Sequence, residues 1–203
     1  MPVVALRVLA VLGLLFTSLA SAQTIIKPEP PPAAGASKAI EPNEVTLPAR
    51  KLVYVRGQAD LDNVYGAVVD ALKKVHAYLD KEGTAPAGPA IARYTESGDS
   101  GFQFEAGYPV ADTPKSPPTD GIVVGDAPSG KFLDFVHRGS FNNIDETYSA
   151  IDDYFAARGQ QSGGGAEADE DNDVLADSFE QYTTDPLTTG PDKVEVHVMV
   201  PTK

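Results

Sequence analysis

Apolar residues recur at helical spacing in two separate segments of the chain. Between Leu61 and Leu79 they lie alternately four and three positions apart, and the same spacing returns between Ile144 and Phe155. A stripe of this kind along one face is typical of an amphipathic helix that packs on a core. Leu61 and Ile144 are 83 positions apart, so the pattern predicts two similar helices separated by that interval.

The residues at the ends of both stripes are of the types that start or stop helices. Asp60 precedes the first stripe, and Gly83 follows it. Asn143 and Glu146 have the spacing of a capping box at the second stripe, and Gly159 follows its last turn. These residues support helices that begin near positions 61 and 144.

The segments around the two helices also match. A short β-rich run ending in Arg-Gly precedes each helix, an aromatic-Thr strand signal follows it, and an alternating strand that ends in proline closes each half. These segments are residues 52–57, 93–95 and 102–109 in the first half, and 135–139, 181–183 and 194–201 in the second. Coincidental periodicity is the alternative, but it does not account for the shared order. The sequence therefore predicts a duplicated strand-helix-strand-strand unit.

Two copies of this unit predict an α+β domain. Each copy has one helix stripe to bury and one sheet face on which to bury it, so two copies favour one sheet with both helices on the same side. The halves are expected at residues 50–110 and 130–203. Between them, residues 109–128 are rich in Pro, Asp, Thr and Gly around a short predicted strand at 122–124. We interpret this stretch as the connection.

An insertion interrupts the second half at residues 160–175. Three glycines are followed there by an acidic run that contains Asp169, Asp171 and Asp173. A calcium loop of the EF-hand type would need Gly where Val174 stands, and Glu at its twelfth position, which is not present. We therefore interpret the run as a solvated surface loop.

The first 22 residues have the pattern of a secretory signal peptide. Arg7 precedes an apolar run at residues 8–16, and the small residues of Ala20-Ser21-Ala22 fit the cleavage rule. An uncleaved membrane anchor is the alternative, although the run is shorter than the roughly 20 residues that a membrane span needs. We expect cleavage after Ala22 and an exported protein, periplasmic or secreted.

A proline-rich segment follows at residues 23–49. Its six prolines favour extended, solvated chain over any element of a core. We interpret it as a disordered tether in front of a single domain at residues 50–203. The segment does not predict a DNA-binding helix pair, so direct control of transcription is not expected of an exported chain.

The charge and cysteine content narrow the function further. The chain has 29 Asp and Glu against 16 Lys and Arg, a net charge of −13. Arg7 is the only charged side chain in the predicted signal peptide, so its removal leaves −14. This balance argues against a nucleic-acid or anionic-membrane partner. Because the chain has no cysteine, disulfides, thiol catalysis and cysteine-ligated metals are excluded, and stability must come from a packed core.

Several short motifs in the second half match a known type of domain. They are residues 130–139, the helix with Tyr148 and, above all, Ser-Phe-Glu-Gln-Tyr at residues 178–182, followed by Asp-Pro at 185–186. With the two-copy layout, they resemble the GyrI-like family of small-molecule-binding domains, the effector-binding domains attached to many AraC-type and MerR-type bacterial regulators. The resemblance covers about residues 48–202. It implies a twisted antiparallel sheet with two helices and a ligand cleft between the halves.

Glu180 is the central candidate for ligand recognition. It lies two residues from Tyr182 on a predicted strand, so both side chains leave the same face. An ionised carboxylate in a cleft lined by aromatic rings is costly unless it is paired, and no Lys or Arg lies within a few residues. A lipophilic cation would satisfy it. The resemblance implies the same role, because in that family this Glu meets cationic or amphipathic ligands.

Aromatic residues of the two halves are expected to surround such a ligand. Tyr65, Tyr94, Tyr148 and Tyr182 would offer apolar area and cation–π attraction. Phe104 and His137, on predicted strands, are further candidate ligand contacts. The competing interpretation has Glu180 on a solvated sheet face, with the tyrosines in the core.

Three other functions stay open. Burial would raise the pKa of Glu180 beside the Tyr182 hydroxyl and make a general acid/base pair, and some GyrI-like proteins are thought to hydrolyse reactive electrophilic small molecules with such a pair. The related SOUL haem-binding proteins share the architecture, which makes haem a third hypothesis. A non-catalytic partner of an envelope protein is the last. No metal is predicted, since His76, His137 and His197 are scattered and none clearly marks an axial ligand.

Overall fold

The computed structural model describes residues 40–98, 101–160, 175 and 177–202, all within one compact unit. The predicted signal peptide, residues 23–39 of the predicted tether and nearly all of the acidic insertion lie outside the described residues. None of the helices in the described part of the chain is long and apolar enough to cross a membrane.

The described residues form one eight-stranded sheet in which all neighbouring strands are antiparallel. The order across the sheet is β1-β6-β8-β7-β3-β4-β2-β5. The strands are β1 (Asn43–Leu47), β2 (Lys51–Ala59), β3 (Ala90–Gly98), β4 (Gly101–Val110), β5 (Ile122–Asp126), β6 (Gly130–Gly139), β7 (Phe179–Tyr182) and β8 (Val194–Pro201).

The predicted duplication is present in the sheet. Helix α1 (Val64–Glu82) follows β2, and helix α2 (Ile144–Ala156) follows β6. In each half the last strand lies between the other two, because β4 pairs with β2 and β3, and β8 pairs with β6 and β7. The halves join where β3 pairs with β7. The predicted α+β class, with two helices on an antiparallel sheet, is confirmed.

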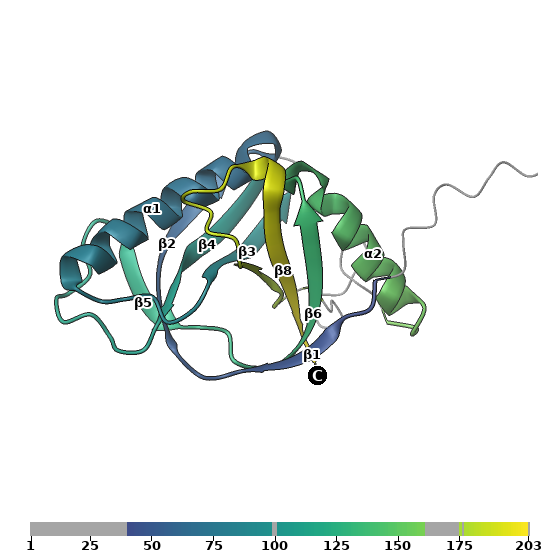
Figure 1. Ribbon diagram of the computed structural model, residues 1–203, viewed down its shortest axis with the longest axis horizontal. Coiled ribbons are helices and arrows are strands. Elements are labelled where there is room, and N and C mark those ends of the chain that lie inside the picture. The colour runs from purple at the N-terminus through teal and green to yellow at the C-terminus, as the bar shows by residue number, and fades with distance from the viewer. Residues whose placement is uncertain (1–39, 99–100, 161–174, 176, 203) are drawn as a thin grey trace, which may run out of the picture. The chain divides into compact units, whose positions relative to one another are not determined.

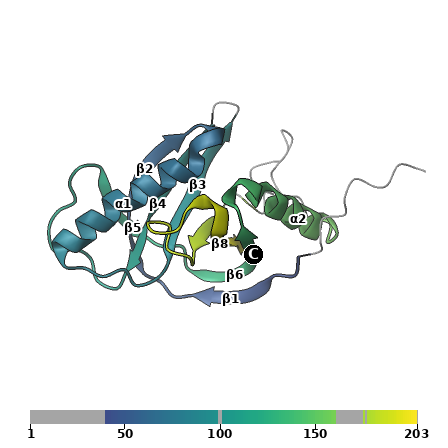
Figure 2. The ribbon, with the colours of Figure 1, turned by 45° about the horizontal axis from the view of Figure 1, so that its top comes forward.

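The two halves exchange their leading strands. β1 precedes β2 in the chain but pairs with β6, and β5 precedes β6 but pairs with β2. Both views show β1 running beside β6 (Figure 1, Figure 2). The prediction of a disordered tether was therefore wrong for residues 43–47. Val45 and Leu47 are half-buried against the apolar cluster on one face of the sheet, and their strand partner lies far along the chain, where no local pattern could indicate it.

Both helices begin with a short 3₁₀ turn, at Leu61–Asn63 before α1 and at Phe141–Asn143 before α2. The starts of the equivalent turns are thus 80 positions apart rather than the predicted 83. The expected caps also differ: neither Asp60 nor Asn143 makes a side-chain cap, whereas the hydroxyl of Ser140 accepts from the Asn142 N–H.

The far end of α1 agrees with the sequence. Gly83 ends the helix in the left-handed conformation, at φ 65°, which glycine adopts without steric cost.

Both helices pack on the same face of the sheet, as β8 demonstrates. Its alternating valines point one way: Val194 and Val196 belong to the core beneath α1, and Val198 and Val200 to the core beneath α2. Met199 points the other way, into a separate apolar cluster with Phe132 and Phe179 on the opposite face. Figure 1 shows α1 along the strands of the first half and α2 along β6.

Candidate functional site

Glu180 lies at the junction of the two halves. It is the second residue of β7, the short strand between β3 and β8. Strand alternation turns Glu180 and Tyr182 toward the helices, while Phe179 packs in the cluster on the opposite face. The predicted shared face of Glu180 and Tyr182 is confirmed, because their side chains meet. The Glu180 side chain is 1% exposed, so the competing interpretation of a solvated sheet face is wrong.

Three tyrosine hydroxyls donate to the Glu180 carboxylate. Tyr182 reaches Oε2 at 2.6 Å and Tyr94 reaches the same oxygen at 3.1 Å, while Tyr148 reaches Oε1 at 3.0 Å. Tyr94 comes from β3, Tyr148 from α2 and Tyr182 from β7. Both halves of the domain therefore contribute to one hydrogen-bonded cluster, which we call the Glu180 cluster (Glu180, Tyr94, Tyr148, Tyr182).

Among the described residues, no cation compensates the charge of the Glu180 cluster. All hydrogen bonds to the carboxylate from the described residues come from neutral hydroxyls, and none of the ion pairs in that part of the chain includes it. Burial raises the pKa of Glu180, and the three tyrosine bonds oppose the shift without overcoming it. Burial and the adjacent carboxylate raise the pKa of each tyrosine well above its usual value. The tyrosines therefore stay protonated donors at neutral pH.

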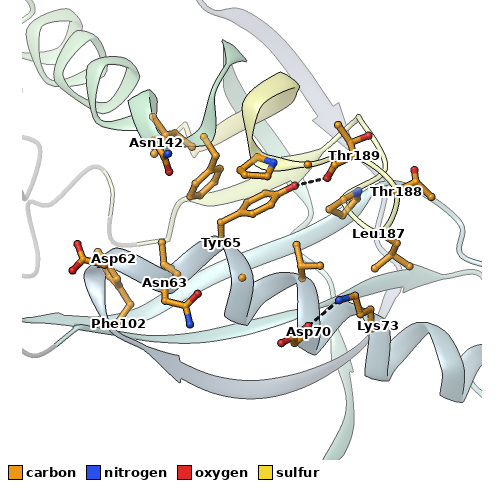
Figure 3. A pocket seen from close by; sticks show the side chains of 18 of the residues that line it. Asp62, Asn63, Tyr65, Asp70, Lys73, Phe102, Asn142, Leu187, Thr188 and Thr189 are labelled. Carbon is orange, nitrogen blue, oxygen red and sulfur yellow. Dashed lines mark hydrogen bonds and ion pairs between the residues drawn. The ribbon is translucent and has the colours of Figure 1, made fainter.

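A cleft of about 1050 Å³ lies between the halves, close to this cluster. Figure 3 shows it between the start of α1, the start of α2 and the loop at residues 186–191. Its volume suits a drug-sized molecule. Aromatic and aliphatic side chains line it together with three aspartates and Lys73, which pairs with Asp70 at 3.0 Å. The principal lining residues are Asp62, Tyr65, Asp70, Lys73, Phe102, Phe141, Asp145, Leu187, Thr188 and Thr189.

Aromatic contacts connect the cleft to the Glu180 cluster. Tyr65 and Phe141 line the cleft, and each has its ring centroid 6.3 Å from that of Tyr182. Phe102 also lines the cleft, and its ring lies 5.4 Å from that of Tyr94. Glu180 itself is not among the lining residues. A layer of aromatic rings thus stands between the cleft and the buried carboxylate.

The structure brings together four of the predicted site residues, the members of the Glu180 cluster. Tyr65 lines the cleft, and its hydroxyl donates to the Thr189 carbonyl at 3.1 Å instead of to Glu180. Phe104 is buried in the core with its ring against Gly57, where an added Cβ would lie 2.4 Å from the ring. Its role as a ligand contact stays a prediction.

His137, the remaining candidate, is buried between β6 and α2. Its Nδ1 lies 2.8 Å from the Thr147 hydroxyl, and its Nε2 lies 3.0 Å from the Ser140 carbonyl oxygen. Both ring nitrogens thus have partners that tie the strand to the start of α2. The described residues contain no group of three or more His, Asp or Glu side chains that could hold a metal ion.

Sequence reasoning missed Phe141, Phe102 and the loop around Leu187 and Thr189. Phe141 directly follows Ser140 in the 3₁₀ turn that starts α2, and an apolar residue at this position is also present at Leu61, 80 positions earlier. Alignment of the halves at this offset of 80, instead of the 83 taken from the helix stripes, would have pointed to it. The loop carries no comparable local signal.

Solved structures share this fold. The C-terminal domain of EcmrR aligns with a TM-score of 0.62 at 11% identity, over 82% of this chain and 99% of that chain. A hydrolase from Listeria innocua aligns with a TM-score of 0.51 at 17% identity, over 82% and 93%. At these identities the likeness shows the fold alone. No curated protein matches the sequence.

The family follows from a match over most of the chain. The model of the GyrI-like small-molecule-binding domain matches residues 40–203. This range contains every strand and helix described above, as well as the cleft and the Glu180 cluster. The chain belongs to the family of GyrI-like small-molecule-binding domains.

Proposed function

We propose that the protein is an exported binding protein that captures a hydrophobic cation, with Glu180 as the partner of its charge. The observation that carries the proposal is the buried carboxylate whose hydrogen bonds from the described part of the chain all come from neutral hydroxyls. An ionised carboxylate in such surroundings is destabilised unless a positive charge accompanies it. A ligand cation supplies that charge, and the tyrosine rings add cation–π attraction.

The composition of the cleft supports an amphipathic ligand. Its rings and aliphatic side chains offer apolar area to the body of the molecule. Among its lining residues, three aspartates face a single lysine that is already paired with one of them. An anionic ligand would meet a net negative surface there, whereas a cationic one is attracted.

Export is supported by the pattern of residues 1–22, with a positive residue, an apolar run and a small-x-small site. An exported domain of this kind would bind its ligand outside the cytoplasm, to sequester or sense it. Processing is tested by mass spectrometry of the protein isolated from cells, which is expected to begin at Gln23. Full-length protein in the cytoplasm would contradict export.

The binding function is tested by thermal unfolding of the purified protein in the presence of tetraphenylphosphonium. A ligand at about 100 times its Kd stabilises the folded state by about 2.7 kcal/mol. Glu180→Gln keeps the shape of the side chain and removes its charge, so this variant is expected to lose the response. Equal stabilisation of wild type and Glu180→Gln would contradict the proposed role of the carboxylate.

A hydrolase is the second candidate, and one contact favours it. The Tyr182 hydroxyl and the Glu180 carboxylate lie 2.6 Å apart, and burial raises the pKa of Glu180; such a pair suits general acid/base catalysis. A hydrolase is also named among the proteins of this fold. Turnover of a neutral electrophile such as an epoxide, abolished in Glu180→Gln, would favour this candidate over the binding protein. Haem belongs in the same screen, with its absorption spectrum as the readout.

A further inference from the structure

A buried polar pair links β6 to α2 beside the Glu180 cluster. His137 is 6% exposed and Thr147 is 8% exposed. The imidazole Nε2 lies 3.0 Å from the Ser140 carbonyl oxygen, which can only accept, so Nε2 carries a hydrogen. In the neutral ring Nδ1 then accepts from the Thr147 hydroxyl at 2.8 Å. Two directed hydrogen bonds therefore hold the start of α2 to the end of β6.

The turn of α2 that is held in this way also carries one donor to the buried carboxylate. Tyr148 directly follows Thr147, and its hydroxyl donates to Glu180 Oε1 at 3.0 Å. Glu180 lies on β7, which is separated from β6 by β8, while α2 lies along β6 (Figure 1). The position of the Tyr148 hydroxyl thus depends on how α2 is placed over the sheet. A rotation of this turn that breaks the Thr147 bond moves Tyr148 as well, because successive residues share one turn of the helix.

The first half makes the same contact between strand and helix without polar side chains. The residue before the Arg-Gly motif is Val55 in the first half and His137 in the second. The fourth residue of the helix is Ala67 in α1 and Thr147 in α2. Val55 and Ala67 pack in one apolar cluster, whereas burial of polar groups costs desolvation free energy. Packing of a helix on this sheet therefore does not require His137 and Thr147, which points to a role in the site beside them.

We propose that His137 and Thr147 are positioning residues that hold the Tyr148 hydroxyl on the Glu180 carboxylate. Their effect on ligand binding rests on the proposed cation-binding function, whereas the positioning itself does not. Apolar packing is not directional, so by itself it does not fix the rotation of α2. The hydrogen bonds fix the distance and angle of the turn. His137 thus acts on the carboxylate through Tyr148, a role that differs from the ligand contact predicted from the sequence.

The positioning is tested without a ligand, by NMR titration of the Glu180 carboxyl carbon in isotope-labelled protein. Burial raises the pKa of Glu180, and the Tyr148 hydrogen bond opposes the rise, so Tyr148→Phe is expected to raise this pKa further. Thr147→Val removes only the anchoring hydroxyl and is expected to reproduce most of that increase. In a Tyr148→Phe background, Thr147→Val is expected to raise the pKa no further, because the bond that Thr147 positions is already absent.

Three further variants separate positioning from a loss of stability. Thr147→Ser keeps the hydroxyl and is expected to keep the wild-type pKa of Glu180. Thr147→Ala introduces the residue that the first half has at this position, favours the helix and carries the same prediction as Thr147→Val, should the latter not fold. Ala150→Gly weakens the same helix through its backbone and is expected to lower the midpoint of urea unfolding without changing the pKa of Glu180.

Two results of the NMR titration would refute the positioning. In the first, Thr147→Val or Thr147→Ala lowers the midpoint of urea unfolding but leaves the pKa of Glu180 at its wild-type value, so that the pair is merely structural. In the second, the effects of Thr147→Val and Tyr148→Phe on the pKa add in full, so that Thr147 does not act through the Tyr148 hydroxyl.

The consequence for binding is tested by calorimetric titration with tetraphenylphosphonium over a range of pH. The cation is expected to bind the ionised carboxylate, so its affinity falls as pH drops through the pKa of Glu180. The midpoint of this fall is expected to move to higher pH in Thr147→Val and in Tyr148→Phe, and to stay in place in Thr147→Ser. An unchanged midpoint in Thr147→Val would show that the pair has no part in binding. If wild type does not bind the cation at all, the binding function fails, while the NMR titration still decides the positioning.

Discussion

Two buried carboxylates on opposite faces of the sheet are stabilised in different ways. Glu105, on β4, is 5% exposed and accepts hydrogen bonds from the guanidinium groups of Arg56 and Arg93. Burial raises its pKa, but the two arginines outweigh burial and hold the pKa below its usual value. Glu180 is more deeply buried, at 1% exposed, its three donors among the described residues are neutral, and burial raises its pKa. Within the part of the chain that the structure describes, the same sheet thus holds one carboxylate with internal cations and one without.

The difference shows what position 180 lacks. Because Glu105 obtains two arginines from neighbouring strands, this fold is able to provide cations for a buried carboxylate. At Glu180 the neighbouring strand and helix provide tyrosines instead. Glu180 thus has no positively charged partner among the described residues, and this is the physical basis for expecting a cationic ligand there.

The two halves differ at equivalent positions as well. Arg56 pairs with Glu105 and Arg138 with Glu195, and a glycine follows each arginine, so these pairs correspond in the two halves. Counting along the ladders from these pairs, Glu180 and Tyr182 in β7 correspond to Ala90 and Ala92 in β3. The first half therefore buries two alanines where the second half builds the polar cluster.

The largest expected effect comes from giving Glu180 an internal cation. Tyr148→Lys places an ammonium group beside the carboxylate, where it competes with any ligand cation. The stabilisation by tetraphenylphosphonium in thermal unfolding, about 2.7 kcal/mol at 100 times the Kd, is expected to disappear. Ser149→Lys adds the same charge on the exposed side of the same helix and is expected to leave the response intact. A full response in Tyr148→Lys would show that the cation binds elsewhere.

Neutralising the two carboxylates is expected to change stability in opposite directions. Glu105→Gln leaves Arg56 and Arg93 without their ionic partner and destabilises the fold by about 1–2 kcal/mol, a value kept low because Arg56 is 70% exposed. Glu180→Gln removes an uncompensated charge and raises stability by about 1 kcal/mol at pH 8. Urea unfolding at pH 8 measures both. Destabilisation of similar size in both variants would contradict the comparison.

The two carboxylates are expected to affect the pH dependence of stability in opposite directions. Since the folded-state pKa of Glu180 is raised, its ionisation disfavours folding, and wild type loses stability relative to Glu180→Gln as pH rises from about 4.5 through the raised pKa. Each pKa unit corresponds to about 1.4 kcal/mol.

Glu105 has a lowered folded-state pKa, so its contribution is present above the usual carboxyl pKa and is lost as pH falls through the lowered value. Urea unfolding of both Gln variants and wild type between pH 3 and 8 gives the two curves. Parallel curves for the two variants would refute the assigned directions.

The smallest effects are expected from single hydroxyls. Each of three substitutions removes one donor to Glu180: Tyr94→Phe, Tyr148→Phe and Tyr182→Phe. Each is expected to raise the pKa of Glu180 further and to lower the free energy of unfolding at pH 8 by about 0.5–1.5 kcal/mol. Tyr182 makes the shortest of the three bonds and is expected to give the largest shift. Tyr54→Phe is the control on the other face, because the Tyr54 hydroxyl accepts from Arg56 at 3.4 Å and both arginine bonds to Glu105 remain. A larger effect at Tyr54 than at Tyr182 would contradict the ranking.

The sequence determined the elements whose signals are local. The spacing of apolar residues indicated both helices, the alternation from Val194 to Val200 indicated β8, and the two-residue step from Glu180 to Tyr182 fixed their common face. Each of these follows from the backbone period of a helix or a strand within a few residues. The absence of cysteine likewise excluded disulfides, thiol catalysis and cysteine-ligated metals. The acidic composition argued against a nucleic-acid or anionic-membrane partner, which stays a prediction.

Only the tertiary structure decided which faces meet. Tyr94 and Tyr148 lie 86 and 32 positions from Glu180, and they reach its carboxylate because β3 pairs with β7 and α2 packs on the sheet. Residues 43–47, within the segment predicted as a tether, form β1 because they pair with β6 of the other half. A local pattern indicates the face on which a side chain lies, but the partner of that face is set by strand pairings between distant segments. These pairings enclose Glu180 and place Tyr65 between it and the cleft.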